Sequence, residues 1–312
     1  MQTKTSTQSK NKNAVTCENL HFSYSFKSIL QDVNLAIPQG AVVGLIGANG
    51  CGKSTLLRCL VGLQIPHQGQ VHLFDIPALE MDDTVRERLG FVAQSADLFP
   101  WMTVEKHITM IGQAYPKWRE RRAIELALRL RLPMGREVSQ LSGGDQQKLA
   151  VVLALAHQPD LIILDEPVSS LDPMTRRDFM RSLFQDGRSF FSDSVDEVND
   201  SEPEYAPTII ISSHLLSDLE RVVSHVAFMR DGRIQLFDEW DAVLEFIRVV
   251  PKSLCKLPKS LCIAENAEQL ILDIRTLHNW TKTNPATGFD IDAIITAPSI
   301  NGLDDLFIAL NS

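Results

Sequence analysis

An α/β fold with a mostly parallel sheet is the fold class that the sequence predicts, and three observations lead to it. The runs 41–46, 161–164 and 208–212 are short and almost wholly apolar, which is typical of strands buried on both faces of a sheet. Each run has a neighbouring segment with apolar residues at helical spacing. Strands that alternate with helices favour parallel pairing, because each crossover then carries a helix.

The N-terminal elements follow from a change in periodicity. Polar and apolar residues alternate over 14–37, which predicts two antiparallel strands, and the Pro-Gln-Gly sequence at 38–40 closes them as a turn. The apolar run 41–46 predicts a buried strand. The glycine-rich segment 47–52 then leads into good helix formers at 53–62, so the order here is strand, loop, helix.

The middle of the chain has a different character. Residues 103–115 and 118–130 have helical periodicity, and no strand signal separates them, which predicts a helical insertion. Alternation returns with a helix at 148–157 and the strand at 161–164. Further along the chain, a buried strand is expected at 208–212, a helix at 214–223 and another strand at 225–229.

Three parts are expected along the chain. Residues 1–14 are polar and predict a disordered tail, 15–237 form the main domain, and 238–312 form a small C-terminal region that begins with a helix. Within the main domain, 95–140 are the helical subdomain. Residues 186–207 carry seven acidic residues and one arginine, which predicts a solvated, mobile insert.

Composition excludes several classes of protein. The 312 residues carry a net charge of −9, which argues against a nucleic-acid partner held by a general basic field. No apolar run approaches the ~18 to 20 residues of a membrane helix, and the N-terminus lacks a signal peptide's apolar centre. The five cysteines lack C-x-x-C spacing, so neither a disulfide framework nor a zinc site is indicated. A cytoplasmic protein with reduced thiols is expected.

A phosphate-binding loop is predicted by the sequence Gly-Ala-Asn-Gly-Cys-Gly-Lys-Ser at 47–54. Backbone amides of such a loop turn inward around phosphate oxygens, and the following helix N-terminus adds positive potential. Lys53 would contact the β- and γ-phosphates, Ser54 would bind Mg²⁺, and Thr55 would reach the α- and β-phosphates. A tight turn with a solvated lysine is the alternative. The other candidate binding residues of this loop are Gly47, Asn49, Gly50, Cys51 and Gly52.

Two carboxylates end the apolar run at 161–164. The strand delivers Asp165 and Glu166 to the carboxyl edge of the sheet, where ligands of α/β proteins bind. Asp165 is suited to Mg²⁺, and Glu166 to holding and polarising an attacking water as general base. The alternative interpretation is that both acids cap the turn at Pro167.

The sequence Leu-Ser-Gly-Gly-Asp at 141–145 separates this chain from other phosphate-loop proteins. With it, the sequence resembles the nucleotide-binding subunit of ABC transporters, over Val15 to about Leu236. The resembling features occur in the family's order. They are Tyr24, the loop at 47–54, Gln94, the signature residues Ser142, Gly143 and Gly144, the acidic strand, Ser170 to Asp172, and Ser213 with His214.

The resemblance implies a role for each matched residue. It places Tyr24 on the adenine, and Gln94 on Mg²⁺ and the attacking water. It makes Asp172 an interface residue and His214 a clamp on the γ-phosphate. Strand packing for Tyr24, a solvated loop position for Gln94 and a helix N-terminal position for His214 are the structural alternatives. In the family two subunits face head to tail, so each ATP lies between the loop of one and the signature of the other.

Three departures from the family pattern stand out. Asp145 ends the signature where glutamine is usual, next to the expected phosphate contacts. Ala48 and Cys51 replace common loop residues without removing a backbone donor, and the amides and Lys53 are expected to favour the Cys51 thiolate. The acidic insert 186–207 lengthens a link that is normally short. None of these departures predicts an inactive site.

The implied function is that of an ATP-binding and hydrolysing subunit that dimerises around two MgATP and drives a separate integral membrane permease. Residues 302–311 resemble the ending of bacterial ABC exporter ATPases, although a simple amphipathic helix explains the same pattern. Phe99 and Trp101 are expected to be partly exposed where the family's permease docks, or else to pack inside the insertion. The expected location is the cytoplasmic face of the cell membrane. A soluble ABC ATPase, a small-molecule kinase and a binding-only regulator are the alternatives.

Overall fold

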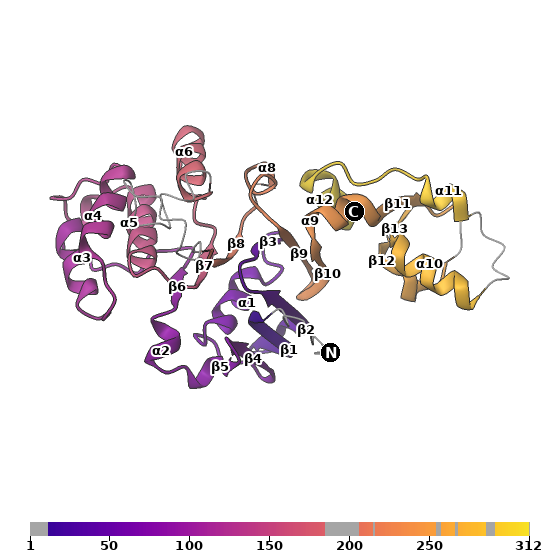
Figure 1. The fold of residues 1–312 in the computed structure, drawn as a ribbon, viewed down its shortest axis with the longest axis horizontal. Helices are drawn as coiled ribbons and strands as arrows, with labels where there is room; N and C mark the ends of the chain where they lie inside the picture. Colours follow the sequence, from indigo (N-terminus) through magenta and orange to yellow (C-terminus); the bar gives the residue numbers. More distant parts are fainter. Residues whose placement is uncertain are drawn as a thin grey trace, which may run out of the picture.

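The computed structural model describes residues 12–184, 206–214, 216–253, 257–265, 268–284 and 291–311 (Figure 1). The helical part lies at one end of the long axis, a small C-terminal lobe lies at the other, and the main sheet lies between them. Within these ranges, none of the helices has both the length and the apolar character that a membrane crossing requires. The acidic insert lies outside the described residues, apart from Ala206 and Pro207.

A six-stranded sheet in the order β10-β9-β3-β8-β7-β6 forms the centre of the molecule. All neighbouring pairs are parallel except β10 with β9, which confirms the predicted mostly parallel sheet. The apolar runs are buried throughout β7 and β8, as strands covered on both faces require. The strands are β3 (Val42–Ile46), β6 (Leu89–Val92), β7 (Leu161–Asp165), β8 (Thr208–Ser212), β9 (His225–Arg230) and β10 (Arg233–Glu239).

A second, antiparallel sheet has the order β2-β1-β4-β5. Its strands are β1 (Asn13–Tyr24), β2 (Lys27–Pro38), β4 (Gln68–Leu73) and β5 (Ile76–Pro77). The two predicted N-terminal strands are confirmed, and β1 begins at Asn13, one residue before the predicted end of the polar tail. Helix α1 (Lys53–Leu60) contacts β2 and β4 of this sheet and β7 of the central sheet, so the two sheets share one buried core.

Between β5 and β7 the chain is helical on both sides of β6. The helices are α2 (Asp83–Arg86), α3 (Val104–Gly112), α4 (Glu120–Arg129) and α5 (Gly143–Leu155), with 3-10 turns at Ala78–Glu80 and Val138–Gln140. Thr103 caps α3 by accepting a hydrogen bond from the Lys106 amide, which fixes where that helix begins. Residues 95–140 are all described and contain no strand, as the sequence predicts. Helix α6 (Pro173–Phe184) follows β7.

The predicted helix over 214–223 is shorter in the structure, where α8 spans Leu216–Leu219. Four residues separate the end of α8 from Ser224, which bonds Val42, the first residue of β3. The Ser224 backbone amide donates to the Val42 carbonyl at 2.9 Å, and its hydroxyl accepts from the Val42 amide at 3.0 Å. These bonds attach the chain to the central sheet directly after the segment predicted as helix.

The C-terminal region does not begin with the predicted helix over 238–250. Strand β10 continues to Glu239, helix α9 covers only Trp240–Phe246, and Ile247–Pro251 form β11. β11 pairs antiparallel with β13, so its β-branched residues are held in a sheet of the order β11-β13-β12. The remaining elements are the 3-10 turn Lys259–Leu261, β12 (Cys262–Glu265), β13 (Gln269–Asp273), α10 (Ile274–Thr283), α11 (Ile291–Ile295) and α12 (Leu303–Asn311).

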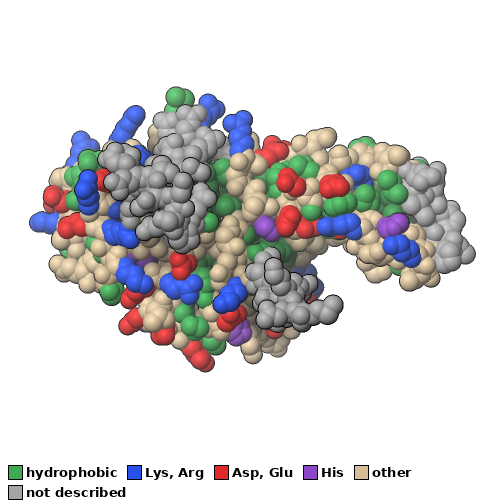
Figure 2. Space-filling view, viewed as in Figure 1, with side chains coloured by type: hydrophobic (Ala, Val, Ile, Leu, Met, Phe, Trp, Pro, Cys, Tyr) green, Lys and Arg blue, Asp and Glu red, His purple; other side chains and the backbone are tan. Residues whose placement is uncertain are grey.

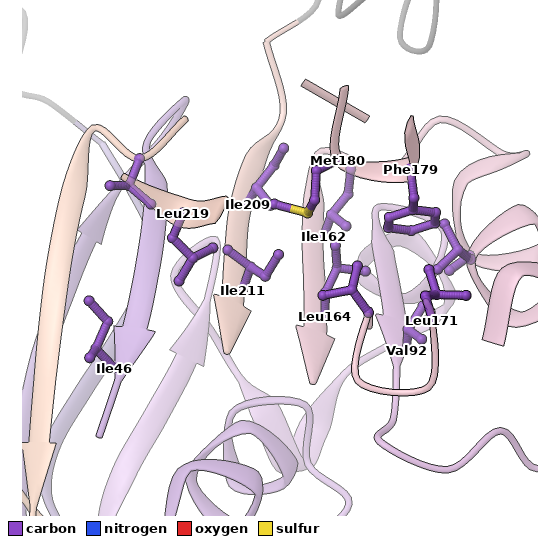
Figure 3. Close-up of a cluster of buried hydrophobic side chains, with 14 of the residues drawn as sticks. Ile46, Val92, Ile162, Leu164, Leu171, Phe179, Met180, Ile209, Ile211 and Leu219 are labelled. Atoms are coloured by element: carbon purple, nitrogen blue, oxygen red, sulfur yellow. The ribbon is translucent and has the colours of Figure 1, made fainter. Parts of the chain in front are cut away.

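One large core joins the central sheet to the elements on the face opposite α1. Figure 3 shows Ile162, Leu164, Ile209 and Ile211 of β7 and β8 beside Met180 of α6. The last helix, α12, packs on the same side of the sheet. The rings of Phe228 in β9 and Phe307 in α12 meet edge to face at 6.1 Å, and Arg230 donates to the Leu310 carbonyl at 2.6 Å.

Phe228 offers a test of this core. Its side chain is fully buried, so Phe228→Ala should lower the free energy of unfolding by about 3 to 5 kcal/mol through lost burial and a residual cavity. Phe228→Leu keeps most of the apolar volume and should lose clearly less. Urea unfolding followed by circular dichroism measures both. An unchanged midpoint for Phe228→Ala would contradict the packing of β9 against α12.

Candidate nucleotide-binding site

The loop between β3 and α1 follows a path that glycine makes possible. Gly52 precedes α1 with φ at 112°, a left-handed conformation that strains other residues. A Cβ at Gly47 would lie 2.3 Å from the Met229 carbonyl oxygen of β9, so no side chain fits there. The loop is therefore pressed against the neighbouring strand, with its backbone wrapped around the start of α1.

Lys53 directs its charge into this loop. The residue is only 7% exposed, although lysine is rarely buried. Its Nζ donates to the carbonyl oxygen of Gly47 at 2.7 Å and to that of Ala48 at 3.2 Å. The loop thus holds an ammonium group beside the N-terminus of α1, where anions bind favourably.

A pocket of about 450 Å³ opens above the loop. It unites residues that are far apart in the sequence, because the carboxyl ends of the parallel strands meet at one edge of the sheet. The predicted residues that line it are Asn49, Gly50, Gly52, Lys53, Ser54, Thr55, Gln94, Glu166 and His214. Sequence reasoning did not find the other three lining residues, Lys27, Ile29 and Ser169.

The acidic end of β7 lies beneath this pocket. Glu166 is 5% exposed and has φ at 50°, which is unusual for a residue with a side chain. Its Oε2 lies 2.8 Å from Nδ1 of His214, so the two predicted catalytic side chains are in direct contact. Asp165 is 1% exposed and does not line the pocket.

Ser212, the last residue of β8, is a further polar residue of this site that sequence reasoning missed. Its hydroxyl donates to Oδ1 of Asp165 at 2.7 Å and accepts from the amide of Glu166 at 2.9 Å. The signal in the sequence is a serine that ends an otherwise apolar strand. Its meaning depends on the register that pairs Asp165 with Ser212, and sequence spacing does not give that register.

The donor set fits Mg²⁺. Oδ2 of Asp165 is buried and has no hydrogen-bond partner among the described atoms, which is costly for a carboxylate unless a cation or water completes it. Carboxylate and hydroxyl oxygens are hard ligands of the kind that Mg²⁺ prefers, and the Ser54 residue lines the pocket.

The signature residues lie outside this pocket. Ser142 caps α5, with its hydroxyl donating to Oδ2 of Asp145 at 2.9 Å and accepting from the Asp145 amide at 3.1 Å. Lys148 pairs with the other oxygen of Asp145 at 2.9 Å, so the carboxylate is balanced by a cation. Ser142 and Gly143 are exposed. The unusual Asp145 therefore contacts the signature serine directly.

Asp172 also lies outside the pocket. Its Oδ1 accepts from the amides of Met174 and Thr175, both at 3.1 Å, at the beginning of α6. Hydrogen bonds from the Thr175 side chain and backbone lower the pKa of this carboxyl. Asp172 is exposed, as an interface residue of an isolated subunit would be.

Tyr24, the residue predicted to contact the adenine, does not line this pocket. It is 45% exposed at the end of β1, and its ring packs edge-on against Phe22 with centroids 4.8 Å apart. On that side the pocket wall is formed by Lys27 and Ile29 of β2.

The expectation that Cys51 is a thiolate is wrong. Its thiol is partly buried, and burial raises its pKa more than Lys53 and the loop amides lower it. A Cβ at Gly47 would lie 2.7 Å from its sulfur, which shows that Cys51 faces the packed side of the loop and not the pocket.

Comparison with known proteins identifies the family. The model of the ABC transporter family matches residues 30–169. The chain is 31% identical over 246 residues to the methionine import ATP-binding protein MetN of Protochlamydia amoebophila, covering 76% of this chain and 66% of that protein. It is 32% identical over 222 residues to the aliphatic sulfonates import ATP-binding protein SsuB 3 of Pseudomonas syringae pv. tomato, covering 70% and 74%. The chain belongs to the ABC transporter family, among its ATP-binding proteins.

Solved structures agree in fold. An ATP-binding subunit of an ABC transporter aligns with a TM-score of 0.62 at 25% identity, covering 74% of this chain and 91% of that one. The dimeric cassette MJ0796 bound to ADP and Pi aligns with a TM-score of 0.60 at 26% identity, covering 72% and 98%. The chain spans 66% of the MetN protein and 53% of the carnitine transport protein OpuCA of Listeria monocytogenes. Since MetN and SsuB 3 are named for import, they lend no support to the resemblance of residues 302–311 to the ending of exporter ATPases.

Alkylation tests the environment of Cys51. Because only the thiolate reacts and burial raises the pKa from its ordinary value of 9.0, Cys51 should react slowly at pH 7.5. Its rate should keep rising above about pH 10, where an exposed thiol with the ordinary pKa is almost fully ionised. Peptide mapping after iodoacetamide treatment across this range, with Cys51→Ser as the control, measures the rate. Rapid labelling at pH 7 would contradict the burial argument.

Proposed function

We propose that this chain is the ATP-binding and hydrolysing subunit of an ABC transporter and energises a separate membrane permease. The observation that carries the proposal is the pocket in which the phosphate loop meets Gln94, Glu166 and His214. A phosphate-binding surface beside a carboxylate and an imidazole is the arrangement that phosphoryl transfer to water requires.

Nucleotide binding falls to the loop and α1. The loop amides and the Lys53 ammonium, held within 3.2 Å of the loop carbonyls, would surround the β- and γ-phosphates. Thr55 would bond the α- and β-phosphates from the first turn of the helix. Ser54, Asp165 and Gln94 would hold Mg²⁺, which when bound neutralises developing charge on the phosphate oxygens.

Hydrolysis falls to Glu166, Gln94 and His214. Glu166 would accept a proton from the attacking water, which Gln94 helps to orient. His214 uses Nδ1 in its contact with Glu166, so its other ring nitrogen, Nε2, would meet the γ-phosphate. This contact also aligns the Glu166 carboxylate, because a hydrogen-bonded side chain loses rotational freedom.

A second ATPase subunit is part of the proposal, as a homodimer or a heterodimer. Ser142, Gly143 and Gly144 stand at the N-terminus of α5 and do not line the pocket of their own chain. An exposed helix N-terminus favours an anion from another molecule. The dimeric state of the related MJ0796 cassette supports this arrangement.

The permease contact is proposed at Phe99 and Trp101. These side chains are 40% and 66% exposed, and their rings lie 5.5 Å apart in the loop before α3. Exposed aromatic pairs favour a protein partner. Such docking would keep the subunit on the cytoplasmic face of the membrane. On the face shown in Figure 2, Lys and Arg side chains stand among Asp and Glu, which does not favour nucleic acid as a partner.

The alternative of a soluble ABC ATPase without a transport role is not favoured, because the relatives compared above are named for transport. A small-molecule kinase would need no signature at the start of α5. A binding-only regulator would need no carboxylate and imidazole in contact at the phosphate pocket.

Glu166→Gln tests the proposed chemistry. The amide keeps the shape of the side chain but cannot accept the proton, so turnover should fall by about 10² to 10⁴ while MgATP binding remains. The purified protein is assayed at saturating ATP, and binding is measured separately by calorimetry. Glu80→Gln, at an exposed position, is the control. Near wild-type turnover in Glu166→Gln would remove Glu166 from the role of base.

The double variant Phe99→Ala/Trp101→Ala tests the permease contact. Because both side chains are partly exposed, the variant should melt normally and hydrolyse ATP, yet bind its membrane partner more weakly. Leu128→Ala, another exposed apolar residue of the helical part, is the matched control. Melting temperature and membrane pull-down are measured on one preparation. A destabilised variant that still binds membranes normally would contradict this assignment.

A further inference from the structure

We propose that Ser212 is a positioning residue for the hydrolysis site, and that its hydroxyl sets both the metal-binding oxygen of Asp165 and the backbone of Glu166. The inference rests on the proposed function and deepens it. Ser212 touches neither nucleotide nor water in this proposal, and it acts through the two acids.

The hydroxyl group contacts both acids at once. It donates to Oδ1 of Asp165 at 2.7 Å and accepts from the Glu166 amide at 2.9 Å. Ser212 is fully buried, and the other residues of β8 are Thr208 and three isoleucines. A buried hydroxyl is costly unless its donor and acceptor are both used, and here both are used by the two adjacent acids.

Strand pairing alone does not explain this hydroxyl. β7 and β8 are already joined by a parallel ladder from Leu161 with Thr208 to Asp165 with Ser212. The backbone of Ser212 also accepts from the Glu166 amide, at 3.2 Å. The side-chain contacts are thus additional to the ladder, and they are directed at the two residues proposed for metal binding and proton transfer.

The contact to Asp165 decides which carboxylate oxygen is available. Oδ1 is engaged by Ser212, whereas Oδ2 is buried without a partner in the described part of the chain. A carboxylate held by one oxygen has a fixed rotamer and presents the other oxygen in a constant direction. Mg²⁺ demands near-ideal octahedral geometry, so this direction affects its affinity.

The contact to Glu166 supports a strained backbone. Glu166 has φ at 50°, a conformation that persists in a residue with a side chain only where its surroundings hold it. The hydroxyl is the nearer of the two acceptors of its amide. Loss of this bond would let the turn relax, and the carboxylate would move away from its position 2.8 Å from His214.

Ser212→Ala is the direct test, and Thr208→Val is the matched control. Thr208 lies at the other end of the same strand, is 1% exposed, and accepts from the Gly40 amide at 2.9 Å. Both variants remove one buried hydroxyl from β8, but only the first removes it from the acids. Three quantities are measured for each: turnover at saturating MgATP, metal-free ATP binding by calorimetry, and Mn²⁺ affinity by electron paramagnetic resonance with a non-hydrolysable ATP analogue.

Ser212→Ala should lose about 10- to 100-fold in turnover and in Mn²⁺ affinity, the range that one hydrogen bond to a charged group supports. Its metal-free ATP binding should stay near that of the wild type. Thr208→Val should change stability without either loss. Wild-type turnover and Mn²⁺ affinity in Ser212→Ala, or equal losses in Thr208→Val, would overturn the inference.

The pair Ser212→Thr and Ser212→Val separates chemistry from packing, since the two side chains have nearly the same shape. Thr should retain more Mn²⁺ affinity than Val, and equal affinities would count against the hydroxyl. Failure of the proposed function is distinguishable, because a wild-type protein that binds ATP and Mn²⁺ without hydrolysis would refute the ATPase while the Mn²⁺ comparison still tests Ser212.

Discussion

Parallel pairing of β3, β8 and β7 is the constraint on which the site depends. It brings the carboxyl ends of three strands to one edge, and with them the phosphate loop, the acids at 165 and 166, and His214. No single segment of the chain contains this combination. The register of β7 with β8 also determines the arrangement of the site, because the pairing of Asp165 with Ser212 places one hydroxyl group between Asp165 and Glu166.

Buried polar side chains at this edge of the sheet lie directly next to the apolar core. The strands behind the edge are apolar and closely packed, whereas Lys53, Asp165 and Ser212 are polar groups at low exposure. Each is satisfied by a defined partner, except for Oδ2 of Asp165. A protein interior tolerates such groups when their hydrogen bonds are made, and this unpaired oxygen is the observation on which the proposed Mg²⁺ site rests.

The local motifs could be predicted from the sequence, and the contacts between distant segments could not. The loop at 47–54 and the acids after 161–164 are each made of consecutive residues, so the sequence alone is enough to recognise them. Ser212 and Lys27 enter the site through strand pairing, and the ionisation of Cys51 depends on packing that only the fold creates. The prediction of a helix over 238–250 was wrong for the same reason, because residues 247–251 pair with β13 as a strand.

The packing of α12 on β9 has a consequence for how the chain can be shortened. Phe228 and Arg230 hold that helix, and the carbonyl of Met229 between them is the group that excludes a side chain at Gly47. A chain that ended before Leu303 would lack α12. The ring of Phe228 would then be exposed to solvent, and Arg230 would lose the Leu310 carbonyl as its hydrogen-bond acceptor. The strand that shapes the phosphate loop would then lose its support on one face. Removing the C-terminal region at the predicted boundary near residue 237 would therefore disturb the phosphate loop through β9, although no residue of that region lines the pocket.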